Sequence, residues 1–176
     1  MTTNSETAHD QTLDQDRDQP RDQIGNQVRD QSPNKDLASA CAERMHETDY
    51  HAQRSGITIV ECASGRCELT MLIRRDMLNG FGSCHGGMIF SLADTAFAYA
   101  CNSRNEANVA MDCRIDFLKP AFEGDILTAK ATEVHRGKQS GLYSIMVSNQ
   151  SDRIVAQFSG RSYYVNKPVL IPNDGE

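Results

Sequence analysis

Residues 86–102 restrict the possible folds of this chain more than any other segment, because they are apolar around the whole circumference of a helix. A helix that is apolar on all sides is buried on most of them, so other elements must cover this one. The longest apolar run, residues 88–101, has 14 residues and includes Asp94, which makes it too short and too polar to span a bilayer. The sequence therefore predicts a long central helix inside a folded domain.

Alternating apolar and polar residues predict β-strands on either side of this helix, most clearly at 109–117. The predicted strands are 57–63 and 67–73 before the helix, and 109–117, 126–136, 142–148 and 154–164 after it. Connections of hairpin length, such as the turn at 137–141, indicate an antiparallel sheet. A first amphipathic helix is expected from Asp36, as its N-cap, to Tyr50. The economical packing is an α+β fold in which one curved antiparallel sheet wraps the long helix.

The first 36 residues differ in composition from the rest. They hold eight acidic and four basic side chains, five apolar residues and no aromatic ring. Such a segment buries too little apolar surface to offset its ordering entropy, so we expect a disordered, acidic Asp/Gln-rich tail at 1–36. A spacer without a partner is the favoured role, and a solubilising or docking arm is the alternative. The folded domain is expected at 37–166 and a C-terminal tail at 167–176. No secretory signal is visible, and we expect a cytoplasmic protein.

Charge and cysteine content exclude several classes of function. The formal net charge is −6 and the pI about 5.3, which disfavours a nucleic-acid binder or a basic membrane-surface helix. Six cysteines without a secretory signal are expected to be free thiols and not disulfides. Cys62 and Cys67 lack a second pair of ligands with metal-binding spacing, so no metal site is predicted.

The start of the long helix is the first candidate for chemistry. In His85-Gly86-Gly87, glycine lets a ligand approach the backbone, and the unpaired N–H groups of a helix start have partial positive charge. That equipment suits a carbonyl oxygen that becomes anionic. The alternative is a tight turn in which glycine serves packing only.

Asp94 is the second candidate, because a carboxylate on an apolar helix face is costly unless it is paired or functional. The alternative is a hydrogen bond to a neighbouring hydroxyl, such as that of Ser91 or Thr95, or a pairing with a cation across an interface. Gly86 and Asp94 are eight residues apart, about 12 Å along a helix. If both act on one substrate, Asp94 must come from another subunit with an antiparallel helix, which predicts a two-fold dimer with two shared sites.

Several blocks resemble the hotdog-fold acyl-CoA thioesterases, in their phenylacetic-acid-degradation (PaaI-type) branch. The resemblance covers about residues 40–165. The blocks are Asn79-Gly80, the segments 83–87 and 90–103, Ile115 to Pro120, Gly124-Asp125 and 137–141. The hotdog fold is a helix wrapped in an antiparallel sheet, in agreement with the pattern above.

The resemblance implies hydrolysis of an acyl-CoA thioester, such as phenylacetyl-CoA or a hydroxylated phenylacetyl-CoA, to the free acid and CoA. In that scheme the Gly86 N–H polarises the carbonyl, and Asp94 of the partner subunit is the base or the nucleophile. Asn79 orients substrate or water, and His85 supports the loop. No cofactor or metal is implied, and the enzyme is expected to be a dimer that pairs into a tetramer.

Further residues are implied in binding the substrate and CoA: Gly87, Ala110, Met111, Arg136, Gly137 and Lys138. One departure from the family concerns water positioning, since some relatives have a serine where this chain has Ala110. Two other functions remain open from the sequence, a non-catalytic acyl-CoA-binding hotdog protein and a hotdog hydratase.

Overall fold

The computed structural model describes residues 33–171, with side chains from residue 37. The helices are α1 (Pro33–His46), α2 (Tyr50–Ser55) and α3 (Gly86–Cys101), with a 3-10 turn, η1, at Arg75–Met77. The strands are β1 (Ile57–Ala63), β2 (Arg66–Leu72), β3 (Asn108–Phe117), β4 (Ile126–Arg136), β5 (Ser140–Asn149) and β6 (Ile154–Tyr164). These elements follow one another in the predicted order, with α2 and η1 in addition.

Most of the two predicted tails, residues 1–32 and 172–176, lies outside the described residues. The division at residues 36 and 166 stays a prediction, although α1 already begins at Pro33. At the C-terminal boundary, Lys167 still contacts the domain, because its carbonyl accepts a hydrogen bond from the Ala107 N–H at 2.7 Å.

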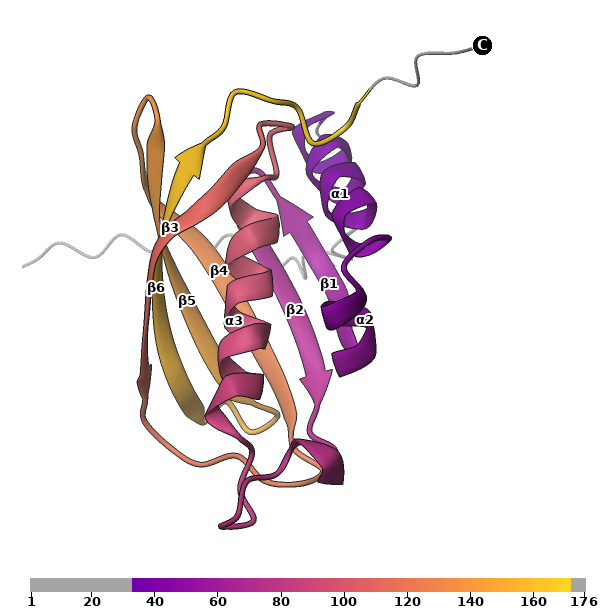
Figure 1. The fold of residues 1–176 in the computed structure, drawn as a ribbon, viewed down its shortest axis with the longest axis vertical. Helices are drawn as coiled ribbons and strands as arrows, with labels where there is room; N and C mark the ends of the chain where they lie inside the picture. Colours follow the sequence, from indigo (N-terminus) through magenta and orange to yellow (C-terminus); the bar gives the residue numbers. More distant parts are fainter. Residues whose placement is uncertain (1–32, 172–176) are drawn as a thin grey trace, which may run out of the picture.

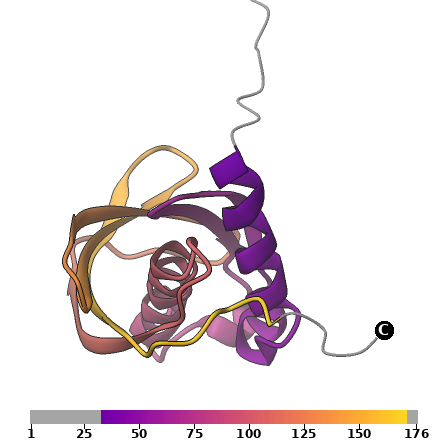
Figure 2. The ribbon, with the colours of Figure 1, turned by 90° about the horizontal axis from the view of Figure 1, so that it is seen from above.

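The strands of the described region form one six-stranded sheet in the order β1-β2-β4-β5-β6-β3. Every neighbouring pair is antiparallel. The sheet curves around α3, and α1 and α2 lie beside β1 (Figure 1 and Figure 2). The predicted arrangement of a long helix wrapped by a curved antiparallel sheet is confirmed.

Helix α3 is the centre of the core, as its apolar circumference predicts. Leu92, Ala93, Ala96 and Ala100 are fully buried, and the helix contacts all the strands of the sheet. Each apolar side chain removed from water in this way stabilises the fold by about 1.5–3 kcal/mol when it is as large as leucine. No helix among residues 33–171 is both long and apolar enough to cross a bilayer.

The first predicted helix, from Asp36 to Tyr50, is wrong in its extent. Two helices occupy this region, since α1 ends at His46 and α2 begins at Tyr50. Asp49 causes the break: its carboxylate accepts a hydrogen bond from the Ala52 N–H at 2.9 Å and caps α2. Gly56, in the left-handed conformation with φ of 70°, ends α2.

The prediction that the cysteines are all free thiols is wrong for one pair. Cys62 and Cys67 lie opposite each other across the β1–β2 hairpin and form a disulfide. The turn at Ser64-Gly65 sets this register, and both side chains are buried on the core side of the sheet. Cys41, Cys84, Cys101 and Cys113 are free.

Strand β3 lies at one edge of the sheet and, among the described residues, pairs only with β6. A bulge between Ala110 and Asp112 interrupts its register. The predicted alternation therefore holds only in the second half, where Cys113 and Ile115 pack against the core. Val109 and Met111 are instead exposed, and β3 offers an open edge lined by apolar side chains.

Candidate active site

At the start of α3, one backbone N–H group has no hydrogen-bond acceptor among the described residues. His85 is the N-cap residue, and its Nδ1 accepts a hydrogen bond from the Gly87 N–H at 3.0 Å. The His85 carbonyl accepts the Met88 N–H at 2.9 Å. Among the described residues, nothing accepts a hydrogen bond from the Gly86 N–H. This donor is free at the positive end of the helix dipole and suits a carbonyl oxygen that gains negative charge.

Asn79 belongs to the loop before α3, where it holds the turn together. Its Oδ1 accepts hydrogen bonds from the backbone N–H groups of Phe81 at 2.8 Å and Ser83 at 3.3 Å, and its Nδ2 donates to Ser83 Oγ at 3.0 Å. The loop is also closed by a β-bridge between Leu78 and Cys84. Asn79 is therefore fixed in the loop, and its second Nδ2 hydrogen has no acceptor in the described part of the chain.

A pocket of about 380 Å³ joins these two features. Asn79 and Gly86 both line it, together with Phe117, the last residue of β3, and Lys119 from the segment that follows the strand. The Phe117 ring lies close to Gly86: a Cβ added there would be 3.0 Å from its ring tip. The pocket thus offers an aromatic wall beside a free N–H, and Phe117 is a lining residue that sequence reasoning did not single out.

Asp94 lies elsewhere, half-buried in the middle of α3, and does not line this pocket. Ser91, one of its expected partners, donates instead to the Gly87 carbonyl at 2.9 Å. The observed partner is Cys113 of β3, whose Sγ is 3.8 Å from Asp94 Oδ1. Burial raises the pKa of Asp94, the hydrogen bond from Cys113 lowers it, and the charge of Asp49 raises it again.

Two further predicted residues, Ala110 and Met111, lie at the bulge of the open β3 edge. Both are exposed, and neither contacts the pocket beside Gly86. The methyl group of Ala110 cannot form a hydrogen bond to a water molecule, so it cannot replace the serine that some relatives have at this position.

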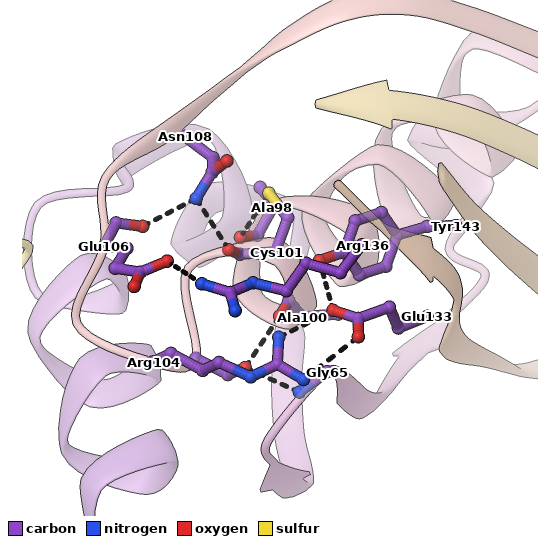
Figure 3. A network of polar contacts seen from close by, with 11 residues as sticks. Gly65, Ala98, Ala100, Cys101, Arg104, Glu106, Asn108, Glu133, Arg136 and Tyr143 are labelled. Atoms are coloured by element: carbon purple, nitrogen blue, oxygen red, sulfur yellow. Dashed lines mark hydrogen bonds and ion pairs between the residues drawn. The ribbon is translucent and has the colours of Figure 1, made fainter. Parts of the chain in front are cut away.

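The predicted CoA-binding turn, Arg136-Gly137-Lys138, connects β4 and β5 near the end of α3 opposite to Gly86. Arg136 forms an ion pair with Glu106 (Figure 3). Lys138 is exposed and forms no ion pair with another described residue. The pocket at this turn has only about 20 Å³, so one chain alone offers a small recess here.

Beneath this turn lies a second, more buried ion pair. Arg104 Nη1 lies 2.6 Å from Glu133 Oε2, and the Tyr143 hydroxyl donates to the same oxygen at 2.8 Å (Figure 3). Burial alone would raise the pKa of Glu133, but the hydrogen bonds from Arg104 and Tyr143 outweigh it and lower that pKa. This network fixes the end of α3 against β4 and β5.

One chain thus keeps the predicted chemistry in three separate places. Gly86, Gly87, His85 and Asn79 are together at the start of α3, Asp94 faces β3, and the cationic turn lies at the far end. In the part of the chain that the structure describes, no group of three or more His, Cys, Asp or Glu side chains is placed to hold a metal ion.

Comparison with known proteins identifies close relatives. Residues 81–156 match the family model of the thioesterase superfamily. The acyl-coenzyme A thioesterase PaaI of Escherichia coli is 52% identical over 124 residues, which cover 70% of this chain and 89% of the relative.

Solved structures agree with the sequence match. That of the E. coli PaaI protein from the phenylacetic acid degradation operon gives a TM-score of 0.76 at 48% identity, covering 77% of this chain and 98% of the other. A Streptococcus mutans structure bound to acetyl CoA gives a TM-score of 0.62 at 27% identity, covering 64% and 90%.

Proposed function

This chain belongs to the hotdog-fold acyl-CoA thioesterases of the thioesterase superfamily, in the PaaI-type branch, and from that premise we propose which residues hydrolyse the thioester and which acyl group is released. The family predicted from the sequence is confirmed, and the protein is a thioester hydrolase. The roles of individual residues and the acyl group are the proposal.

The Gly86 N–H binds the thioester carbonyl oxygen and stabilises the negative charge that develops on it. The observation that carries this assignment is that no group among the described residues accepts the Gly86 N–H at the pocket wall, whereas His85 accepts the Gly87 N–H. His85 acts by capping the helix and Asn79 by holding the loop, while the remaining Nδ2 hydrogen of Asn79 contacts substrate or water. Gly87 lets the substrate pass close to the backbone.

Asp94 of the partner subunit supplies the carboxylate. Within one chain Asp94 is eight residues, or about 12 Å, from Gly86, which is beyond the reach of its side chain. The open edge of β3, with the exposed apolar side chains of Val109 and Met111, supports a two-fold dimer at this strand. An antiparallel partner helix then brings each Asp94 toward the other subunit's Gly86.

Two chemical routes follow from this placement. Asp94 either takes a proton from water, which attacks the carbonyl carbon, or attacks that carbon itself and forms an anhydride that water then hydrolyses. In both routes the C–S bond breaks, CoA leaves as a thiolate that takes up a proton, and the acid is released. Ala110 does not position the water, because it has no polar side-chain atom.

CoA carries phosphates, and the turn between β4 and β5 supplies cations for them. Lys138 is the stronger candidate, because no described acidic group neutralises it, whereas Arg136 is paired with Glu106. Gly137 lets the turn approach the ligand. Ala110 and Met111 contact the substrate from the β3 edge.

The acyl group is aryl-acetyl, with phenylacetyl-CoA or a hydroxylated analogue as the substrate. Phe117 supports this choice, because its ring forms one wall of the pocket beside Gly86 and suits edge or stacked contact with an aromatic acyl group. The origin of the E. coli relative, the PaaI protein from the phenylacetic acid degradation operon, points the same way.

Thiol release from phenylacetyl-CoA, hydroxyphenylacetyl-CoA and straight-chain acyl-CoAs tests the substrate. We expect the highest kcat/KM for the aryl-acetyl esters; equal or higher values for straight chains would overturn this preference. Phe117→Leu should lower kcat/KM for the aryl-acetyl esters more than for octanoyl-CoA.

Two variants of Gly86 test the oxyanion donor. Gly86→Pro removes the N–H at a helix position that tolerates proline, after a residue whose extended backbone (ψ of 132°) also tolerates it. We expect kcat to fall by about 10²–10³-fold. Gly86→Ala is the matched control, since it adds a methyl group against the Phe117 ring but keeps the donor. Equal losses in both variants would show that bulk and not the N–H matters.

A further inference from the structure

We propose that Cys113 is a positioning residue for the reaction: its thiol donates a hydrogen bond that fixes the Asp94 carboxylate toward the β3 edge and favours its charged form. The inference rests on the proposed role of Asp94. It assigns to Cys113 a function that acts through Asp94, without direct contact with the substrate.

The contact itself is the first support. Cys113 Sγ lies 3.8 Å from Asp94 Oδ1, and among the described residues no other group forms a hydrogen bond with this carboxylate. No described Lys or Arg acts on it, and the charged or titratable groups around it are Asp49 at the start of α2 and Cys101 on its own helix. Asp112, beside Cys113 on β3, adds a further negative charge. The thiol is therefore the one described group that stabilises the charged form of Asp94.

The fold explains why this cysteine faces the helix. The bulge at Met111 resets the alternation of β3, so that Cys113 and Ile115 turn toward the core while Met111 does not. Cys113 is paired with Gly160 of β6, where a Cβ would lie 2.9 Å from the Phe97 ring. The aromatic ring fills the space beside Gly160, and Cys113 is left half-buried against α3 at the level of Asp94.

The protonation state suits a donor. Burial, and then the negative charge of Asp94, raise the pKa of Cys113 to about 11, so the group is a thiol at neutral pH. It thus has the proton that a donor needs and lacks the thiolate that a nucleophile needs. In return, the hydrogen bond lowers the pKa of Asp94 against the effect of burial. Loss of this bond would protonate Asp94 at a higher pH and disable it there, whether it acts as base or nucleophile.

The test is the pH profile of kcat/KM in Cys113→Val and Cys113→Ser, with Cys41→Ala as a control at a buried cysteine of α1. Valine keeps the volume and removes the donor, whereas serine keeps a donor. We expect the acid limb of Cys113→Val to move to higher pH, so that its kcat/KM at acid pH falls by about 3–10-fold relative to wild type while the plateau changes less. The acid limb of Cys113→Ser should lie closer to that of the wild type than the limb of Cys113→Val does. The pH profile of Cys41→Ala should match that of the wild type.

A well-folded Cys113→Val with an unchanged acid limb would overturn the inference. Asp94→Asn distinguishes this failure from that of the proposed function: if Asp94→Asn keeps full activity, the role of Asp94 itself is wrong, whereas an inactive Asp94→Asn with an unaffected Cys113→Val removes only the role of Cys113.

A second measurement does not need a Cys113 variant to fold. Carbon-13 NMR of cysteine-labelled protein follows the ionisation of Cys113 directly. In Asp94→Asn, the loss of the neighbouring negative charge should let Cys113 ionise at lower pH than in wild type, because the coupling between the two groups is reciprocal. The same Cys113 titration in both proteins would contradict the contact.

Discussion

His85 Nδ1 accepts the Gly87 N–H at 3.0 Å, whereas the neighbouring Gly86 N–H has no acceptor within residues 33–171 and is a free donor at the start of α3. The bond requires an unprotonated Nδ1, so the ring nitrogen acts here as a capping acceptor. In His85-Gly86-Gly87, the histidine therefore caps the Gly87 N–H, and the Gly86 N–H beside it is open to substrate.

The cap predicts different results for two substitutions of His85. His85→Ala removes the acceptor, which should lower the free energy of unfolding by about 1 kcal/mol and, because the donor is no longer held in place, lower kcat by about tenfold or more. His85→Asn keeps a side-chain acceptor and should retain most of both. Urea unfolding and steady-state kinetics check this, and an Asn variant as inactive as the Ala variant would instead assign His85 a role in proton transfer.

Asp94 should reduce stability at neutral pH. Burial raises the pKa of Asp94 in the folded state above its pKa in the unfolded chain, so the folded state binds the proton more tightly. The free energy of unfolding therefore falls as the pH rises from the unfolded-state pKa to the folded-state pKa. We expect Asp94→Asn to raise Tm at pH 7 while activity falls, and the gain in Tm to shrink toward pH 4. Asp112→Asn is the control: Asp112 is exposed, so its substitution should leave Tm almost unchanged. A lower Tm for Asp94→Asn at pH 7 would contradict the sign.

Glu133 should behave in the opposite way. Its hydrogen bonds with Arg104 and Tyr143 lower its pKa despite burial, so its contribution to stability is present above the unfolded pKa and is lost as pH falls through the folded one. Glu133→Gln should therefore lower Tm at pH 7, with a difference that shrinks at acid pH. Glu106→Gln, at the more exposed pair with Arg136, should have the smaller effect.

The disulfide gives a prediction that mass spectrometry checks. When the protein is unfolded without reductant and alkylated, four cysteines should be labelled, and six after reduction. Reduction of the Cys62–Cys67 bond should also lower the free energy of unfolding by about 2 kcal/mol, the entropy expected for so short a loop. Six labels without reductant would show that the pair is reduced in the protein as prepared.

Local patterns predicted the parts of this fold that depend on local order. The apolar circumference of α3 and the alternation in the strands were sufficient, because burial sets both. The α1–α2 break was missed because the amphipathic pattern does not mark where the first helix ends, whereas the capping side chain of Asp49 starts a second one. The disulfide and the β3 bulge depend on the register between strands, which no single segment contains.

The candidate site divides in the same way. Gly86 and His85 follow from a helix start, and Asp94 follows from a charge on an apolar face. The contact between Asp94 and Cys113 joins two elements 19 residues apart and needs the bulge to form. Phe117 reaches Gly86 from the end of β3, and no spacing in the sequence indicates that approach.

Mixing two inactive variants tests the shared site most directly. Asp94→Asn and Gly86→Pro subunits, unfolded together and refolded at equal concentration, should regain about a quarter of wild-type thiol release, since half of the dimers are mixed and each has one intact site. Each variant refolded alone should stay inactive. No recovery in a mixture that contains mixed dimers would contradict the account, because it would mean that Gly86 and Asp94 act within one chain.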